Sequence, residues 1–212
     1  LLVHPMLYVR RDGDGELISV AEPGTPGTLV EAWTQVEFDR CDNERTEQLA
    51  HELRSAVGLV HRVVSDFAPM RERMLALGEV DPLLEWLADN QFVFLGAGTY
   101  DVGPELELRP DTVLGQLAPG APIDPPFDPG AAALSIARSV ERSAIHRPAR
   151  MTVVSVRHTD AGGAQVVDRF VGLLASTAYR HSVLSIPSVG DRVRAVLGLT
   201  PAGAETHTGR SM

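Results

Sequence analysis

The chain has 212 residues, 44% hydrophobic and 22% charged, which is ordinary for a globular protein of one or two domains. Its net charge of −9 argues against nucleic acid and membrane surfaces as partners, because both select a basic face. A single cysteine, Cys41, excludes an internal disulfide framework and a cysteine-rich zinc site, so a reducing, cytoplasmic setting is expected.

All 19 basic residues are arginines. The chain therefore lacks the amine that Schiff-base, P-loop and other lysine-assisted mechanisms require. Residues 1–5 show neither a signal-peptide pattern nor an initiator Met, so we expect an excised fragment.

The first 40 residues have the pattern of a small β module. Residues 6–9 are apolar and β-prone, the Asp-Gly repeat at 12–15 is a turn signal, and 16–20 form the return strand of a hairpin. After a Pro- and Gly-rich loop at 22–27, residues 28–40 are predicted to form one long strand.

A long amphipathic helix is predicted to begin at Asp42 or Asn43, either of which can cap it. Apolar side chains recur along it at three- and four-residue spacing: Leu49, Leu53, Val57, Val60 and Val64. We expect this stripe to dock on a sheet or another helix. Pro69 is expected to end or kink the helix, and a second short helix should follow to residue 77.

Further signals lie between residues 81 and 130. Asp81 is a candidate N-cap, and Pro82 suits the first position of a short helix. Residues 91–95 are β-prone, and the proline-rich segment 118–130 is predicted to be a loop.

The last third contains the clearest hairpin. Residues 150–158 and 164–174 should pair around a turn at Gly162-Gly163. Residues 131–139 are predicted as a strand or short helix, and 188–197 as a helix. The order of strands, helices and strands predicts an α+β fold with antiparallel sheets.

The segment "FLGAGTYDVG" resembles the start of a dinucleotide fingerprint. Its third glycine would fall at Asp101, and no helix is expected to follow, so we interpret Gly96 to Gly98 as a turn at a strand end. The seven histidines have no zinc-site spacing, and no serine lies in a nucleophile-elbow motif.

Four residues around the late hairpin are candidate ligand-binding groups: His146, Arg147, Arg157 and Arg169. Two alternatives remain open. Arg169 can pair with Asp168 or another acid as a surface ion pair, which contributes little. Otherwise, Arg147, Arg157 and Arg169 converge on a carboxylate or phosphate, which guanidinium groups bind bidentately. Neither alternative joins a nucleophile to a base, so no catalytic residue and no metal site is predicted.

Several segments together resemble a known family. They are "HPMLYVRRDGDGEL", "EAWTQVEFDR", "LLEWLADNQFVFLG", "IHRPARMTVVSVR", "DRFVGLLASTAY" and "SIPSVGDRVRAVL". In order and spacing they are similar to the N-terminal, non-catalytic region of the large NAD-specific glutamate dehydrogenases of bacteria. In that family the catalytic lysines and nucleotide-binding glycines belong to a later domain.

The resemblance implies four parts. Residues 1–40 would be the end of an ACT-like β module, 41–80 a helical connector, 81–180 a PAS-like α+β domain with an antiparallel sheet, and 181–212 a helix and tail linking to the next module. The chain would bind no cofactor of its own, whereas the parent enzyme would use NAD.

The resemblance also implies a function. The whole enzyme would oxidise L-glutamate to 2-oxoglutarate and ammonium, and this fragment would serve regulation or assembly. Its partners would be other domains and subunits in a homo-oligomer, with an amino acid or related metabolite as effector. A stand-alone amino-acid-sensing module is the alternative, and a hydrolase using His146 or His158 is a third hypothesis.

Overall fold

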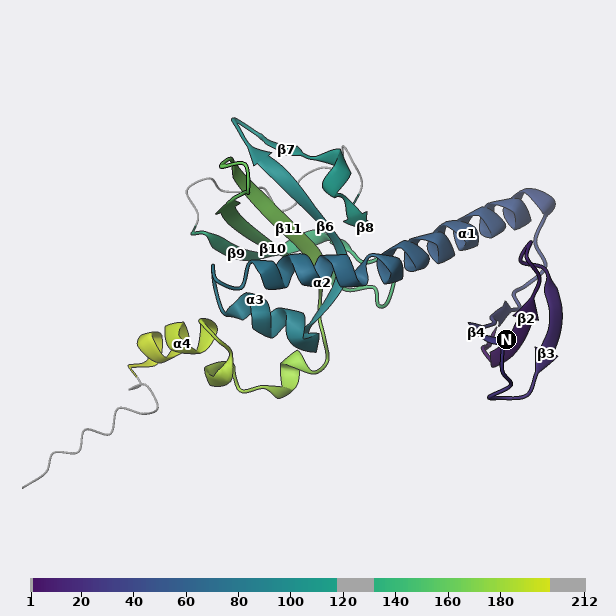
Figure 1. Cartoon of the computed structure of the whole chain (residues 1–212). Coiled ribbons are helices and arrows are strands. Elements are labelled where there is room, and N and C mark those ends of the chain that lie inside the picture. The colour runs from purple at the N-terminus through teal and green to yellow at the C-terminus, as the bar shows by residue number, and fades with distance from the viewer. Residues whose placement is uncertain (1, 118–131, 199–212) are drawn as a thin grey trace, which may run out of the picture. The chain divides into compact units, whose positions relative to one another are not determined.

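A computed structural model describes residues 2–117 and 132–198, and its elements are shown in Figure 1. The chain divides into two compact units, Leu1–His51 and Glu52–Met212. The loop predicted at 118–130 lies outside the described residues. The predicted division into four parts stays a prediction.

The first unit is built from short antiparallel strands. Strand β2 (Met6–Arg11) lies between β3 (Leu17–Ala21) and β4 (Leu29–Ala32), while β1 (Leu2–Val3) pairs with β5 (Gln35–Val36). The predicted β2–β3 hairpin is confirmed. The Asp12 carboxylate closes its turn by accepting the backbone N–H groups of Asp14 at 3.0 Å and Glu16 at 2.8 Å.

The long strand predicted at 28–40 is wrong. The structure has β4 and the two-residue β5 there, and residues 37–42 are irregular. Pro5 explains the interruption. Its carbonyl accepts the Trp33 N–H at 3.0 Å, but proline has no N–H to return, so the ladder between β2 and β4 ends at this point.

Two helices follow, as predicted. Helix α1 (Asn43–Ser65) is capped by the Asp42 carboxylate, which accepts the Arg45 N–H at 2.8 Å. Helix α2 (Phe67–Ala76) begins after a break at Asp66, so that Pro69 lies in its first turn, where the missing N–H costs least.

The apolar stripe of α1 does not dock as expected. Leu53, Val57, Val60 and Val64 are all exposed, and Val64 has 69% of its surface accessible. Val63, on a neighbouring face of the helix, is the α1 residue that joins the core, with Leu59 packed partly against it. The periodicity therefore identified an apolar face, but not the face that packs.

The second unit is organised around one antiparallel sheet. Its strand order is β7 (Leu106–Leu108), β6 (Phe92–Val102), β11 (Gln165–Leu174), β10 (Arg150–Thr159) and β9 (Leu134–Arg142), and β8 (Leu114–Gly115) also pairs with β6. The α+β class with antiparallel sheets is thus confirmed. The late hairpin is confirmed as β10–β11, and strand β9 covers residues 134–139 of the segment predicted as strand or helix.

Helix α2 and the short α3 (Leu83–Trp86) pack beside this sheet (Figure 1). Met70, Met74 and Leu84 are fully buried there with Phe94 and Phe170, whose rings meet edge to face with centroids 6.2 Å apart. Asp81 caps α3 as predicted, because its carboxylate accepts the Leu83 N–H at 2.9 Å.

The turn predicted at Gly96 to Gly98 is also wrong, since both glycines lie inside the eleven-residue strand β6. A Cβ at Gly98 would come within 2.8 Å of the Leu108 side chain, and one at Gly96 within 3.0 Å of the Leu117 backbone. These glycines therefore let Leu108 and Leu117 pack closely against strand β6, where a larger side chain would clash.

The chain after β11 forms two short 3₁₀ turns, Ala178–Arg180 and Val183–Ser185, and then α4 (Val189–Leu197), where a helix was predicted. Between β6 and α3, a turn at Leu87–Gln91 holds Asn90 at a positive φ of 60°. No helix in the described ranges is long and apolar enough to cross a membrane.

Candidate functional site

Strand β11 sends its two central charged residues to opposite faces of the sheet. Asp168 pairs with Val156 of β10 and Thr99 of β6, whereas Arg169 pairs with Ser155 and Gly98. Because side chains alternate along a strand, Arg169 and Asp168 do not face each other. The alternative in which these two neighbours form an ion pair is therefore not found.

Arg169 is only 3% exposed. Its Nε donates to the Ser155 hydroxyl at 3.2 Å, and its guanidinium lies 5.9 Å from the centroid of the Tyr100 ring. Burial raises the pKa of the Tyr100 hydroxyl, an effect that the charge of Arg169 opposes. Arg157 is opposite Val167, two residues from Arg169, so both arginines lie on this face.

The other two predicted residues lie elsewhere. Arg147 is exposed, and its Nη2 donates to the Leu174 carbonyl at 2.7 Å, at the far end of β11. Leu174 is five residues from Arg169, roughly 17 Å along an extended strand. His146, beside Arg147, is exposed with a φ of 68°. The structure thus brings Arg157 and Arg169 together, but not His146 or Arg147.

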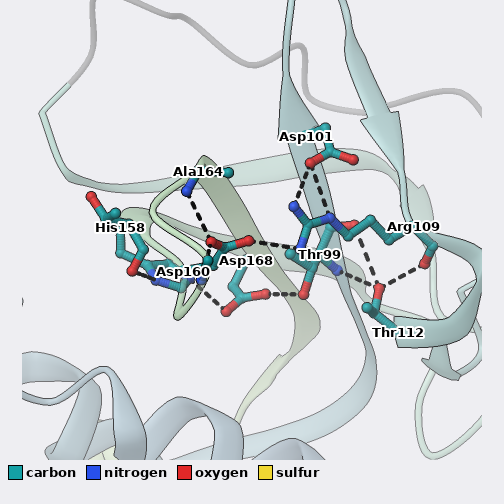
Figure 2. Close-up of polar contacts among 10 residues, drawn as sticks. Thr99, Asp101, Arg109, Thr112, His158, Asp160, Ala164 and Asp168 are labelled. Carbon is teal, nitrogen blue, oxygen red and sulfur yellow. Dashed lines mark hydrogen bonds and ion pairs between the residues drawn. The ribbon is translucent and has the colours of Figure 1, made fainter.

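The opposite face carries a polar group that sequence reasoning missed (Figure 2). Asp168, 5% exposed, accepts hydrogen bonds from the Thr99 hydroxyl and from Nε2 of His158, the latter at 2.9 Å. The carboxylate lies between the hydroxyl and the imidazole, so the Thr99 hydroxyl donates its hydrogen bond to Asp168 and not to a histidine base. This order differs from a nucleophile–histidine–acid relay and gives no support to the hydrolase hypothesis.

Arg109 extends this network toward the end of the sheet (Figure 2). Its Nε and Nη2 donate to one Asp101 oxygen at 2.9 and 2.6 Å, and its Nη1 donates to Asp160 at 2.9 Å. The Thr112 hydroxyl donates to the Arg109 carbonyl at 2.7 Å and accepts the Thr99 N–H at 2.9 Å. Arg109, which directly follows β7, thus ties strand β6 to the β10–β11 turn.

The charges of this network stabilise one another. The hydrogen bonds from Arg109 lower the pKa of Asp101. The pKa of Asp160 is lowered first by the Ala164 backbone N–H and then by Arg109. The bonds to Asp101 and Asp160 raise the pKa of Arg109. Every charged group here has a protein partner, so we assign the network a structural role.

Metal binding finds no support in the described part of the chain, where no group of three or more His, Cys, Asp or Glu side chains could hold an ion. The Sγ of Cys41 is 3.3 Å from the Thr46 hydroxyl.

Residues 1–53 match the family described as "Glutamate dehydrogenase, ACT1 domain". Over 98% of its length the chain is 31% identical to an NAD-specific glutamate dehydrogenase of Pseudomonas aeruginosa, and 26% identical to one of Halomonas elongata. A third, from Mycobacterium tuberculosis, is 26% identical over 99% of the chain. The chain spans only about 15% of the length of these relatives.

Proposed function

We propose that this chain, which is homologous over nearly its whole length to part of the NAD-specific glutamate dehydrogenases, is a non-catalytic region that assembles and regulates such an enzyme. The whole protein would oxidise L-glutamate to 2-oxoglutarate and ammonium with NAD in the cytoplasm. Residues 1–40 would complete an ACT-like module, and 81–180 would be PAS-like.

The exposed apolar stripe of α1 carries the assembly role. Leu53, Val57, Val60 and Val64 follow one another at spacings of four, three and four residues. This is the a/d spacing of a two-helix seam, with Val57 and Val64 at a positions. A contiguous apolar stripe in water marks a surface that another protein covers.

A second copy of the chain is the occupant that we propose. A strict a/d stripe is narrower than the face a helix presents to a globular core, so it suits a facing helix of the same pattern. β-branched residues at a favour two strands, and α1 is 23 residues long, about 34 Å. The stripe can therefore pair with its own copy along several turns.

Light scattering after size exclusion tests this assembly. The wild-type chain should be dimeric or larger, and the double substitution Val57→Glu with Val64→Glu should convert it to a monomer with unchanged circular dichroism. Val196→Glu is the matched control, since Val196 is 85% exposed on α4 outside the stripe. A monomeric wild type, or a double variant that still associates, would refute the role.

The composition supports the absence of catalysis in this region. The chain has no lysine. In the buried group of Thr99, Asp168 and His158, the hydroxyl bonds to the carboxylate and not to the imidazole, so no base is placed to activate a nucleophile. Incubated with L-glutamate and NAD, the purified chain should form no NADH. Formation of NADH that scales with protein concentration would overturn this part of the proposal.

The alternative, a stand-alone amino-acid sensor, is favoured by one observation: Arg157 and Arg169 share a face of the sheet. If they bind an anion, L-glutamate or 2-oxoglutarate at about 100 times its Kd should raise the free energy of unfolding by roughly 2.7 kcal/mol. Arg169→Gln should abolish this shift, whereas Arg147→Gln, at the far end of β11, should not. Without a shift in the wild type, the alternative fails.

A further inference from the structure

The second unit contains a pocket of about 400 Å³ away from the arginine pair. It lies between α3, strands β9 and β10, and the segment that runs from β11 to α4. Its lining is mainly apolar and includes Leu83, Trp86, Ile136, Thr152, Val154 and His181. This size is within the range of pockets that hold small molecules.

Two features of this pocket point to a ligand. Thr152 is only 5% exposed, yet its hydroxyl makes no hydrogen bond within the described ranges. This hydroxyl is not among the fully buried atoms without a partner, and because it lines the pocket it can accept or donate a hydrogen bond to a bound molecule. Trp86 and His181 meet edge to face with centroids 5.7 Å apart and form an aromatic wall.

A smaller pocket of about 250 Å³ adjoins the first and shares Leu83, Ile136 and Val189 with it. Apart from Leu134, its remaining lining is polar and carries one acid, Asp81, and one base, Arg192. The two pockets therefore adjoin along these shared residues, and together we call them the depression, with an apolar end and an end that carries one acid and one base.

The polar end is held in place by the fold. One Asp81 oxygen accepts both the Leu83 N–H at 2.9 Å and the Ser188 hydroxyl at 2.5 Å, which leaves Oδ2 available. Ser188 has a φ of 59°, an uncommon conformation for a non-glycine residue. The guanidinium of the exposed Arg192 has no hydrogen-bond or ion-pair partner in the described part of the chain.

We propose that this depression binds an α-amino acid with a large apolar side chain. The ammonium group lies against Asp81, the carboxylate against Arg192, and the side chain enters the apolar pocket beside Trp86 and Thr152. A zwitterion suits one fixed acid and one base at the same end. L-Glutamate fits poorly, because its second carboxylate would lose its hydration in an apolar pocket.

Binding here has a structural consequence. The lining comes from α3, from the sheet and from the segment that leads into α4, so a ligand would hold these three elements together. Binding here does not depend on the assembly of α1, because no residue of α1 lines either pocket. It also assigns amino-acid binding to residues other than the predicted His146, Arg147, Arg157 and Arg169.

Tryptophan fluorescence of the full chain provides a direct test, since Trp86 lines the pocket and the other tryptophan, Trp33, lies in the first unit. Titration with L-phenylalanine or L-isoleucine should give a saturable change. The change should persist in Trp33→Phe and disappear in Trp86→Phe. If neither amino acid gives saturable binding by fluorescence or calorimetry, the proposal is wrong.

Analogues and variants test the orientation. Phenethylamine lacks the carboxylate, 3-phenylpropionate lacks the ammonium, and L-alanine lacks the large side chain, so each should bind much more weakly than L-phenylalanine. Arg192→Gln should weaken L-phenylalanine binding by about tenfold or more, as loss of a charge-assisted contact implies. Thr152→Val keeps the side-chain shape and should weaken binding less.

Arg180→Gln is the matched control, because Arg180 is an exposed arginine in the segment before α4 that does not line either pocket. It should bind L-phenylalanine like the wild type. Equal binding of phenethylamine and L-phenylalanine, or unchanged binding in Arg192→Gln, would contradict the proposed site. Since these measurements do not involve α1, their failure would be distinct from failure of the assembly.

Discussion

The two units differ in how much of their own surface they bury. In the first unit, Val9 is the one buried apolar residue among those described, while Met6, Ile18, Val20 and Val30 on neighbouring strands are exposed. In the second unit, helices and a six-stranded sheet enclose a continuous core. A three-stranded sheet without such cover is marginally stable alone, whereas the second unit has the parts of an independent domain.

The largest expected contrast concerns aromatic side chains. Phe170→Ala removes a fully buried ring from the second unit and should lower the free energy of unfolding by about 3–5 kcal/mol. Phe38→Ala in the first unit removes an exposed ring and should change it by less than about 0.5 kcal/mol. Urea denaturation followed by circular dichroism measures both. Equal effects would mean that the units do not differ as described.

A smaller effect is expected at the buried carboxylate of the second unit. Asp168→Ala leaves Thr99 and His158 without their acceptor and should cost about 1–3 kcal/mol of stability. Asp191→Ala is the control, since this carboxylate is exposed and its pair with Arg194 should contribute about 0.5 kcal/mol or less. The same denaturation measurement applies, and similar losses in both variants would contradict the assignment of a buried network.

The smallest effect is a pH dependence in the first unit. Hydrogen bonds from Arg11, at 2.6 and 2.8 Å, lower the pKa of Glu31 from 4.5 to about 2, helped by the Trp33 indole. Because the folded-state pKa is depressed, this stabilisation is fully present above pH 4.5 and is lost as pH falls toward 2.

Trp33 can report this titration. Its Nε1 donates to Glu31 at 2.9 Å, so in a Trp86→Phe background the fluorescence of Trp33 should change with a midpoint well below pH 4.5. Glu31→Gln should abolish the transition. A midpoint at the ordinary value for a glutamate would show that Arg11 and Glu31 are not paired in solution.

Local signals in the sequence predicted the local elements. The Asp-Gly turn before β3, the Asp42 cap of α1 and the glycine turn between β10 and β11 depend on neighbouring residues, and all three are found. Such features are predictable because each depends on a few consecutive side chains.

The errors concern partners that are distant in the sequence. The role of Gly98 depends on Leu108, and Arg109 reaches Asp160 only through the register of the sheet. Pro5 ends a strand that lies about thirty positions later. The apolar stripe of α1 was predicted correctly, but its predicted burial was wrong, because helical periodicity shows that a face is apolar without showing what covers it.

The turn at Leu87–Gln91 fixes where strand β6 begins and the path of the chain as it leaves strand β11. The Asn90 carbonyl accepts the Thr177 hydroxyl at 2.8 Å, and the Gln91 carbonyl accepts the Ala175 N–H at 2.8 Å. A residue inserted in this turn would therefore shift the alternation of side chains along β6 and displace the segment that walls the apolar pocket. An insertion between Gly162 and Gly163 would only lengthen an exposed loop. Insertions and deletions among relatives should accordingly concentrate in the turn between β10 and β11 and be rare in the turn at Leu87–Gln91.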